Sequence, residues 1–75
     1  MKLKTLREDM RPKVTQEMVA RKANLPLSTY IQAETGDPVH YSTVRPILAA
    51  LNQLRRDPKW NLPKLTLDDL ELNIV

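Results

Sequence analysis

The chain has 75 residues, a net charge of +3, a single glycine and no cysteine. This length supports one small domain with a thin core, for which a compact helical bundle is the most economical architecture. The lack of cysteine excludes a disulfide framework and a thiolate metal site, and it fits a reducing cytoplasm. No apolar run is long enough to cross a membrane and no signal peptide is visible, so we expect a cytoplasmic protein. The mild positive charge favours an anionic partner, although ordinary surface charge would look the same.

Residues 1 to 11 are predicted to form a first helix. Leu3, Leu6 and Met10 are spaced so that they form one apolar stripe along it. Pro12 cannot continue a helix and is expected to stop this one. The stripe predicts which side of the helix faces the core.

The stretch from 15 to 36, TQEMVARKANLPLSTYIQAETG, is typical of two short helices joined by a tight turn. Thr15 is a good N-cap, because its side-chain oxygen can accept from the amides of the first turn. Asn24 tolerates the left-handed conformation that a tight turn requires, and Pro26 can begin the second helix. Gly36 is expected at the left-handed position that ends it.

Small and apolar residues predict the buried sides of these two helices. Val19, Ala20 and Ala23 form a narrow stripe on the first helix. Tyr30 and Ala33, three residues apart, form the buried side of the second helix. We therefore expect the two helices to pack through these positions.

After a loop at 37–42, residues 42 to 56 are predicted to form a fourth helix, because their apolar residues keep the 3.6-residue period. These residues are Val44, Ile47, Leu48, Leu51 and Leu54. Pro46 removes an early intrahelical hydrogen bond, so either the regular helix starts late, near Arg45, or its first turn is distorted. His40 is interpreted as a loop or capping residue, since no cysteine or obvious carboxylate partner lies near it.

A proline-punctuated loop follows at 57–64 and carries Trp60, the only tryptophan. Trp60 either caps the small core together with Leu62 or contacts a partner, because exposed tryptophans often anchor interfaces. These two alternatives stay open at the level of sequence.

The C-terminal segment predicts a short helix and an extended tail. Residues 65 to 70 form the helix, with Thr66 as its cap. Asp68 and Asp69 then lie in its first turn, where carboxylates suit the helix dipole, so they need no metal to explain them. From residue 70 to the C-terminus, apolar and polar residues alternate, which suggests a short strand or an extended arm.

The composition offers little for catalysis. One histidine and no cysteine exclude most nucleophile–base pairs, and a single glycine excludes a glycine-rich phosphate loop. The carboxylates are spread over helix ends and faces. We therefore expect a protein that is not an enzyme and that uses neither a cofactor nor a metal.

The order of these parts resembles the helix-turn-helix of the phage-repressor-like (Xre-type) DNA-binding family. Five pieces carry the resemblance within 15–36: TQE at 15–17, VA at 19–20, Leu25 in the turn, STY at 28–30 and ETG at 34–36. Residues 43–51 are similar to the family's T-L-x-x-I-A-x-A-L helix. The resemblance covers roughly the first two-thirds of the chain. It implies an all-α, lambda-repressor-like bundle of about five short helices in a single domain spanning 1–75, with the motif at 15–36.

The resemblance also implies internal contacts. Ala20 would allow the two motif helices to approach closely. In the family, an arginine of the first helix pairs with the glutamate near the end of the third, which is Glu34 here. Arg7 is the first candidate for that arginine and Arg11 the second; the alternative is a solvated arginine that contributes little.

In the resembling family, the second motif helix enters the major groove with its N-terminal residues at base edges. The residues expected to read bases are Leu27, Ser28, Ile31 and Gln32. Those expected at the phosphates are Gln16, Thr29, Thr43, Lys13, Lys22 and Arg45. Gln16 would contact a phosphate from the N-terminus of a helix, and the two threonines would contact the backbone through their hydroxyls. The lysines and the arginine would supply positive potential. Asp37 stands where family members often carry a lysine or arginine, a departure from the pattern.

The sequence therefore predicts a small cytoplasmic regulator of transcription, a repressor that binds double-stranded DNA. We expect a homodimer, with Trp60, Leu62, Leu72 and Ile74 as the contact. The alternative is a protein-interaction module that kept the fold and lost the DNA; an antitoxin-type role would combine both. Leu27 and Ile31 would then bind protein, which is consistent with the lack of lysine and arginine on the reading face.

Overall fold

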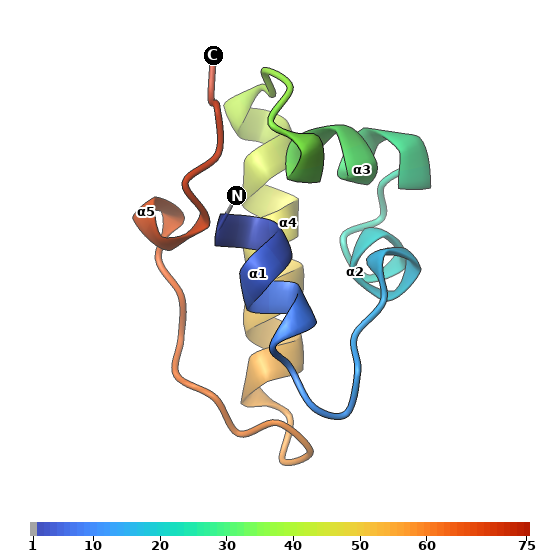
Figure 1. The fold of residues 1–75 in the computed structure, drawn as a ribbon, viewed down its shortest axis with the longest axis vertical. Helices are drawn as coiled ribbons and strands as arrows, with labels where there is room; N and C mark the ends of the chain where they lie inside the picture. The colour runs from blue at the N-terminus through green and yellow to red at the C-terminus, as the bar shows by residue number, and fades with distance from the viewer. Residues whose placement is uncertain (1) are drawn as a thin grey trace.

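Five helices and almost no strand make up residues 2–75, the part of the chain that the structure, a computed structural model, describes (Figure 1). The helices are α1 (Lys2–Glu8), α2 (Gln16–Lys22), α3 (Leu27–Thr35), α4 (Tyr41–Arg56) and α5 (Leu67–Leu70). The predicted all-α class with about five short helices is confirmed.

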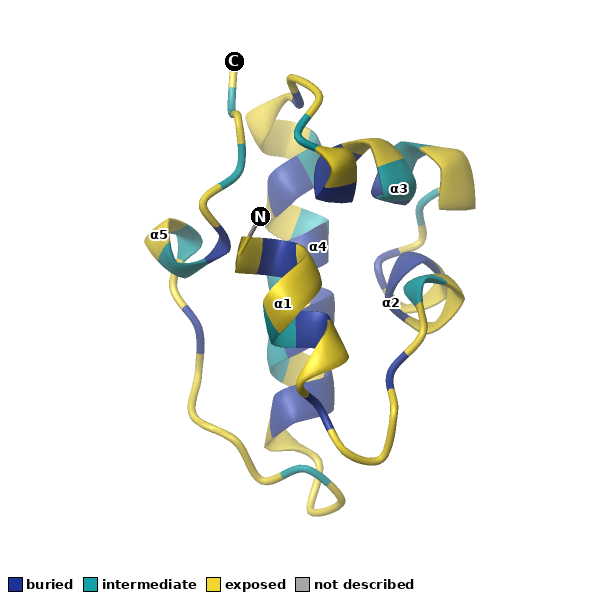
Figure 2. Ribbon diagram, viewed as in Figure 1, coloured by how far each residue is buried: buried dark blue, intermediate teal, exposed yellow. Residues whose placement is uncertain are grey.

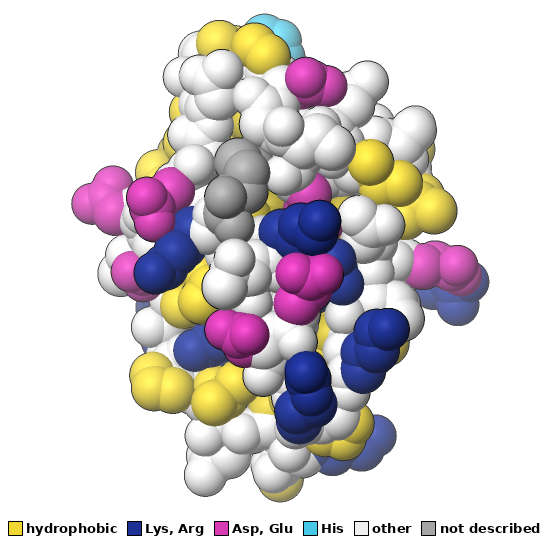
Figure 3. All heavy atoms as spheres, viewed as in Figure 1, with side chains coloured by type: hydrophobic (Ala, Val, Ile, Leu, Met, Phe, Trp, Pro, Cys, Tyr) yellow, Lys and Arg dark blue, Asp and Glu magenta, His cyan; other side chains and the backbone are white. Residues whose placement is uncertain are grey.

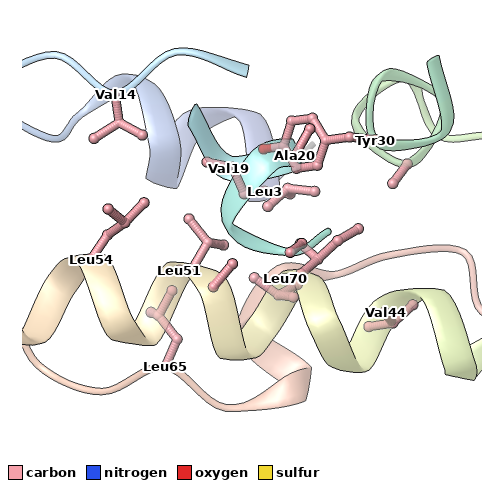
Figure 4. Packing of buried hydrophobic residues seen from close by; sticks show 14 of the residues in the cluster. Leu3, Val14, Val19, Ala20, Tyr30, Val44, Leu51, Leu54, Leu65 and Leu70 are labelled. Atoms are coloured by element: carbon pink, nitrogen blue, oxygen red, sulfur yellow. The ribbon is translucent and has the colours of Figure 1, made fainter. Parts of the chain in front are cut away.

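The long helix α4 organises the arrangement. In Figure 1 it runs along the longest axis behind α1, with α2 and α3 on one side and α5 on the other. Val44, Leu51 and Leu54 project from α4 into the core (Figure 4). Val19 and Ala20 of α2 lie opposite them. The inner sides of the helices are buried and the outer sides are exposed, as the colours of Figure 2 show.

Three local signals of the segment from 15 to 36 are confirmed, whereas Pro26 is the N-cap of α3 and the helix itself begins at Leu27. The Thr15 hydroxyl accepts a hydrogen bond from the Met18 N–H at 3.2 Å and so caps α2. Asn24 is left-handed with a φ of 58°, and Gly36 ends α3 with a φ of 95°. Both turns need this conformation, which asparagine tolerates and glycine adopts without strain. Ala20 is buried, as expected of the position nearest to α3.

The first helix is shorter than predicted. It ends at Glu8, and the predicted start at residue 1 lies outside the described residues. The Arg11 guanidinium folds back and donates to the carbonyl of Glu8 and, at 2.8 Å, to that of Met10. These carbonyls lie at and just beyond the end of α1, and the Arg11 guanidinium caps them there.

The fourth helix does not start late, which was one of the two alternatives for the effect of Pro46. It begins at Tyr41, directly after His40 at the N-cap, and Pro46 lies inside it. Of the two alternatives, the late start near Arg45 is wrong. Pro46 cannot donate to the carbonyl of Ser42, but Ser42 is exposed, so water can take the place of the missing donor.

The loop after α4 is tied to the rest of the molecule. The Trp60 indole N–H donates to the carbonyl of Pro12 at 2.7 Å, and the ring packs partly against the core. The core-capping alternative therefore applies to Trp60. It does not apply to Leu62, whose side chain is 37% exposed.

The C-terminal segment closes over α1. Thr66 is the N-cap of α5, as predicted, and its backbone N–H donates to the Asp69 carboxylate at 2.8 Å. This bond, followed by one from the Thr66 hydroxyl, lowers the pKa of Asp69. The extended tail pairs with the loop after α3 through one parallel β-bridge between Val39 and Ile74. Of the two alternatives, a short strand or an extended arm, the tail is an extended segment with a single bridge.

Candidate functional site

A buried ion pair joins α1 to α3. Arg7 and Glu34 are only 6% and 2% exposed. The Arg7 Nε donates to Glu34 Oε2 at 2.6 Å, and Arg7 Nη2 donates to Glu34 Oε1 at 3.1 Å. This is the two-pronged geometry that suits a guanidinium and a carboxylate. The pair predicted from the family resemblance is confirmed with Arg7. The second candidate, Arg11, instead caps carbonyls at the end of α1.

Two further side chains complete the network around Glu34. The Tyr30 hydroxyl donates to Glu34 Oε2, and the Gln16 side-chain amide donates to Glu34 Oε1 at 3.0 Å. Arg7 also donates to the carbonyl of Val14 at 3.0 Å. One carboxylate therefore holds α1, α2 and α3 together. The sequence contained a signal for Tyr30, because residues four apart on a helix are neighbours, but not for Gln16.

The network keeps Glu34 ionised. Burial alone raises the pKa of Glu34, but hydrogen bonds from Arg7, Tyr30 and Gln16 outweigh it, so the pKa lies below its ordinary value. The hydrogen bond to Glu34 raises the pKa of Arg7 despite burial. Burial and the bond to Glu34 raise the pKa of Tyr30, so its hydroxyl stays protonated. The charges and donors are thus fixed at neutral pH.

The opposite side of α3 is mostly exposed to solvent. Leu27 is 41% exposed, Ser28 and Gln32 are exposed, and Ile31 is half-buried. The outer surface of α3 is coloured as exposed in Figure 2. All four residues predicted to read bases therefore lie on one short helix, with three of them open to solvent. Neither lysine nor arginine occurs in α3.

Two of the predicted phosphate contacts lie at one place. Lys13 and Gln16 line an open depression of about 560 Å³ together with Arg7, Glu8, Arg11 and Thr15. In Figure 3, Lys and Arg side chains gather over α1 and the segment that leads to α2, with acidic side chains among them. The Gln16 amide has two hydrogens, and its bond to Glu34 uses one of them.

The other predicted phosphate contacts are dispersed. Lys22 lines a second depression beside Met18 of α2, and Arg45 lies on α4 beside Ser42. The remaining two, Thr29 and Thr43, are half-buried. The structure therefore does not bring the six residues into one cluster.

The residues predicted to form a dimer contact are divided between two ends of the molecule. Trp60 and Leu62 belong to the loop at the lower end of Figure 1, whereas Leu72 and Ile74 belong to the tail that runs to the upper end. Trp60, Leu72 and Ile74 are also partly buried against the core of their own chain. The four side chains do not form one patch.

Comparison of the chain with protein-family models, with curated proteins and with solved structures returns no match. Within residues 2–75, no group of three or more histidine, aspartate or glutamate side chains is arranged to hold a metal ion. None of the helices in this range is long and apolar enough to cross a lipid bilayer.

Proposed function

We propose that the protein binds double-stranded DNA sequence-specifically and acts as a small repressor of transcription. One observation carries the proposal: α3 is fixed on its inner side by the Glu34 network and presents Leu27, Ser28 and Gln32 outward. A helix that reads a groove must keep a constant orientation, because base-edge hydrogen bonds tolerate little displacement. Such a helix also needs side chains that its own core does not use.

The residues on α3 define what this helix can read. Gln32 can bond adenine through N6 and N7, and Leu27 and Ile31 can pack on thymine methyl groups. The commonest specific contact, arginine to guanine, is not open to this helix. The half-site is therefore expected to be rich in A·T pairs at its centre.

Backbone contacts supply the sequence-independent part of the affinity. Lys13 is exposed and, within residues 2–75, forms no ion pair, so it is free to approach a phosphate. Gln16 can offer its second amide hydrogen to the same strand. Thr29, Thr43, Lys22 and Arg45 extend the contact along the backbone. Asp37 at the end of α3 reduces the affinity on that side.

Binding as a homodimer forms part of the proposal. A single motif reads few base pairs, so two copies on half-sites about one helical turn apart supply the specificity. Of the predicted contact residues, Leu72 and Ile74 are the pair next to the loop that follows α3, through the bridge to Val39. We assign the dimer contact to this tail and an internal role to Trp60, whose indole already has a partner.

Selection from a random DNA pool, followed by titration of variants, tests the assignment. Gln32→Ala should lose roughly 1–3 kcal/mol on the selected site and little on random DNA. Lys13→Gln should weaken both about equally, because a phosphate contact carries no sequence information. Gln16→Ala should do the same and should also lower the melting temperature, since it removes a bond to Glu34. A G·C-centred consensus, or equal losses for Gln32→Ala and Lys13→Gln, would contradict these roles.

The rival function is binding of another protein, alone or in an antitoxin-type role alongside DNA. The exposed Leu27 and the lack of cations on α3 favour it. Salt distinguishes the two functions: contact with phosphates weakens steeply as salt rises, whereas an apolar protein contact responds little. Between 50 and 200 mM salt, binding through six to ten phosphate contacts weakens by roughly 10³–10⁵-fold. An affinity that stays constant over this range would favour the rival function.

A further inference from the structure

The solvent side of α4 carries a continuous stripe of exposed residues. Its members follow the helical period and are Ser42, Arg45, Ala49, Gln53 and Arg56. Two open depressions of about 370 and 420 Å³ lie along this stripe and meet at Ala49. The far wall of the 420 Å³ depression is formed by the loop after α4, through Asn61, Leu62 and Lys64. From Ser42 to Arg56 the stripe is about 21 Å long, at roughly 1.5 Å per residue.

The charge of this surface has one sign. Arg45, Arg56 and Lys64 line the two depressions, and no aspartate or glutamate does so. Within residues 2–75, none of these three cations takes part in an ion pair. The neighbouring Asp57 is engaged in its own turn, where its carboxylate accepts from the Lys59 N–H at 2.9 Å. Asp57 keeps its negative charge but lies outside the lining of both depressions, so that lining is net positive.

The far wall is held in place by hydrogen bonds on both sides of the exposed Leu62. The Leu62 N–H donates to the carbonyl of Arg55 at 2.8 Å, and the Arg55 Nε donates to the carbonyl of Pro63 at 2.8 Å. The Asn52 side chain exchanges two hydrogen bonds with the backbone of Leu65, at 3.0 and 2.8 Å. A groove whose walls are already ordered loses little entropy when a partner binds.

The stripe shares Arg45 with the proposed phosphate contacts, but the residues proposed to read bases lie on α3 and not on the stripe. The inner side of α4, with Val44, Ile47 and Leu51, packs into the core that also holds α2. The stripe lies on the opposite side of the same helix. A partner on it would therefore leave the outer side of α3 free.

We propose that the solvent side of α4 is a docking groove for an acidic amphipathic helix of a partner protein. Arg45 at one end and Arg56 with Lys64 at the other would meet carboxylates near the two ends of that helix. Ala49 lets the partner's backbone approach closely, and Leu62 offers an apolar contact beside it. This function goes beyond DNA binding and does not depend on it.

The spacing of the cations favours a helix over a nucleic acid. About 16 Å separates Arg45 from Arg56 along the helix axis, and Ala49 and Gln53 are the exposed residues of α4 on the stripe between them. Duplex DNA carries a charge about every 1.7 Å along its axis, so its backbone would leave most of its charge unmatched here. A helix with carboxylates near its two ends matches the separation of these cations.

Chemical-shift mapping tests the proposal. The ¹⁵N-labelled full chain is titrated with a synthetic helical peptide of about 15 residues that carries glutamates near both ends and leucines in the middle. We expect the largest shifts at Ala49, Gln53 and Leu62. The double variant Arg56→Gln/Lys64→Gln should weaken binding roughly tenfold. The matched control Lys13→Gln/Lys22→Gln loses the same net charge from elsewhere and should bind the peptide as the wild type does.

Three outcomes would overturn the groove. In the first, the peptide shifts only residues of α2 and α3, or shifts none. In the second, the two double variants weaken peptide binding equally. In the third, duplex DNA shifts the same residues more strongly than the peptide does. All four substituted side chains are exposed, so both double variants should melt as the wild type does, and thermal scans check this. Loss of DNA binding in Lys13→Gln/Lys22→Gln with intact peptide binding separates this groove from the proposed DNA site.

Discussion

Removing Arg7 should destabilise the protein more than any surface change. Glu34 receives two bonds from Arg7, one from Tyr30 and one from Gln16, and its side chain is 1% exposed. The substitution Arg7→Met keeps the length of the side chain but leaves the carboxylate buried with half of its donors. Breaking a buried pair in this way costs about 3–5 kcal/mol. A chain of this size is stable by only about 4–11 kcal/mol, at roughly 0.05–0.15 kcal/mol per residue.

Urea unfolding followed by far-UV circular dichroism measures this loss. At a slope of about 1 kcal/mol per molar urea, the midpoint of Arg7→Met should fall by about 3 M or more, or the variant should be partly unfolded in buffer. The exposed pair between Glu17 and Arg21, four residues apart on α2, supplies a matched control. Arg21→Met should lose less than about 0.5 kcal/mol, because such pairs are solvated.

A double-mutant cycle separates the ion pair from the packing of its side chains. Glu34→Gln alone strands the Arg7 charge, but in the double variant Arg7→Met/Glu34→Gln no unpaired charge remains buried. The double variant should therefore lose at least about 2 kcal/mol less than the sum of the single losses. A loss below 1 kcal/mol for Arg7→Met, or strict additivity in the cycle, would refute the central role of the pair.

Three further predictions concern packing, pH and assembly. Ala20→Leu should overpack the contact between α2 and α3 at a cost of roughly 1–3 kcal/mol, and an unchanged melting temperature would show that Ala20 is not the close contact. The folded state lowers the pKa of Glu34 below its ordinary value of 4.5, so the stability from this group is present above that pH and is lost as the pH falls through the folded pKa. Thermal scans from pH 7 to pH 3 should show a steeper decline for the wild type than for Glu34→Gln, and parallel curves would contradict this. Sedimentation with and without DNA should detect a dimer that Leu72→Ser/Ile74→Ser weakens; a strict monomer in both states excludes the dimer.

Local chemistry made the turn and the caps predictable. Thr15, Asn24 and Gly36 each occupy a backbone position that only a few residue types suit, so the local sequence decides the structure there. The burial of Tyr30 and Ala20 followed from helical periodicity in the same way. Local preference alone therefore predicts the turn before α3 and the residue that ends it.

Contacts between distant segments were harder to predict. Gln16 meets Glu34 only because α2 and α3 cross, and no spacing in the sequence encodes that bond. The early start of α4 depended on the exposure of Ser42, which removes much of the penalty for Pro46. The expected dimer contact is divided because Trp60 and Leu62 follow one end of α4, whereas the tail after α5 runs back to the loop that precedes its other end. Each of these features is set by tertiary packing rather than by local preference.

The position of Trp60 gives the protein an intrinsic optical probe. It is the only tryptophan, and its indole joins the loop after α4 to Pro12, 48 residues earlier in the chain. Its fluorescence therefore reports whether the two halves of the chain are docked, whereas circular dichroism reports the helices themselves. Coincident transitions by the two methods would establish that the bundle unfolds as one cooperative unit. An earlier fluorescence transition would identify the loop as the segment that opens first.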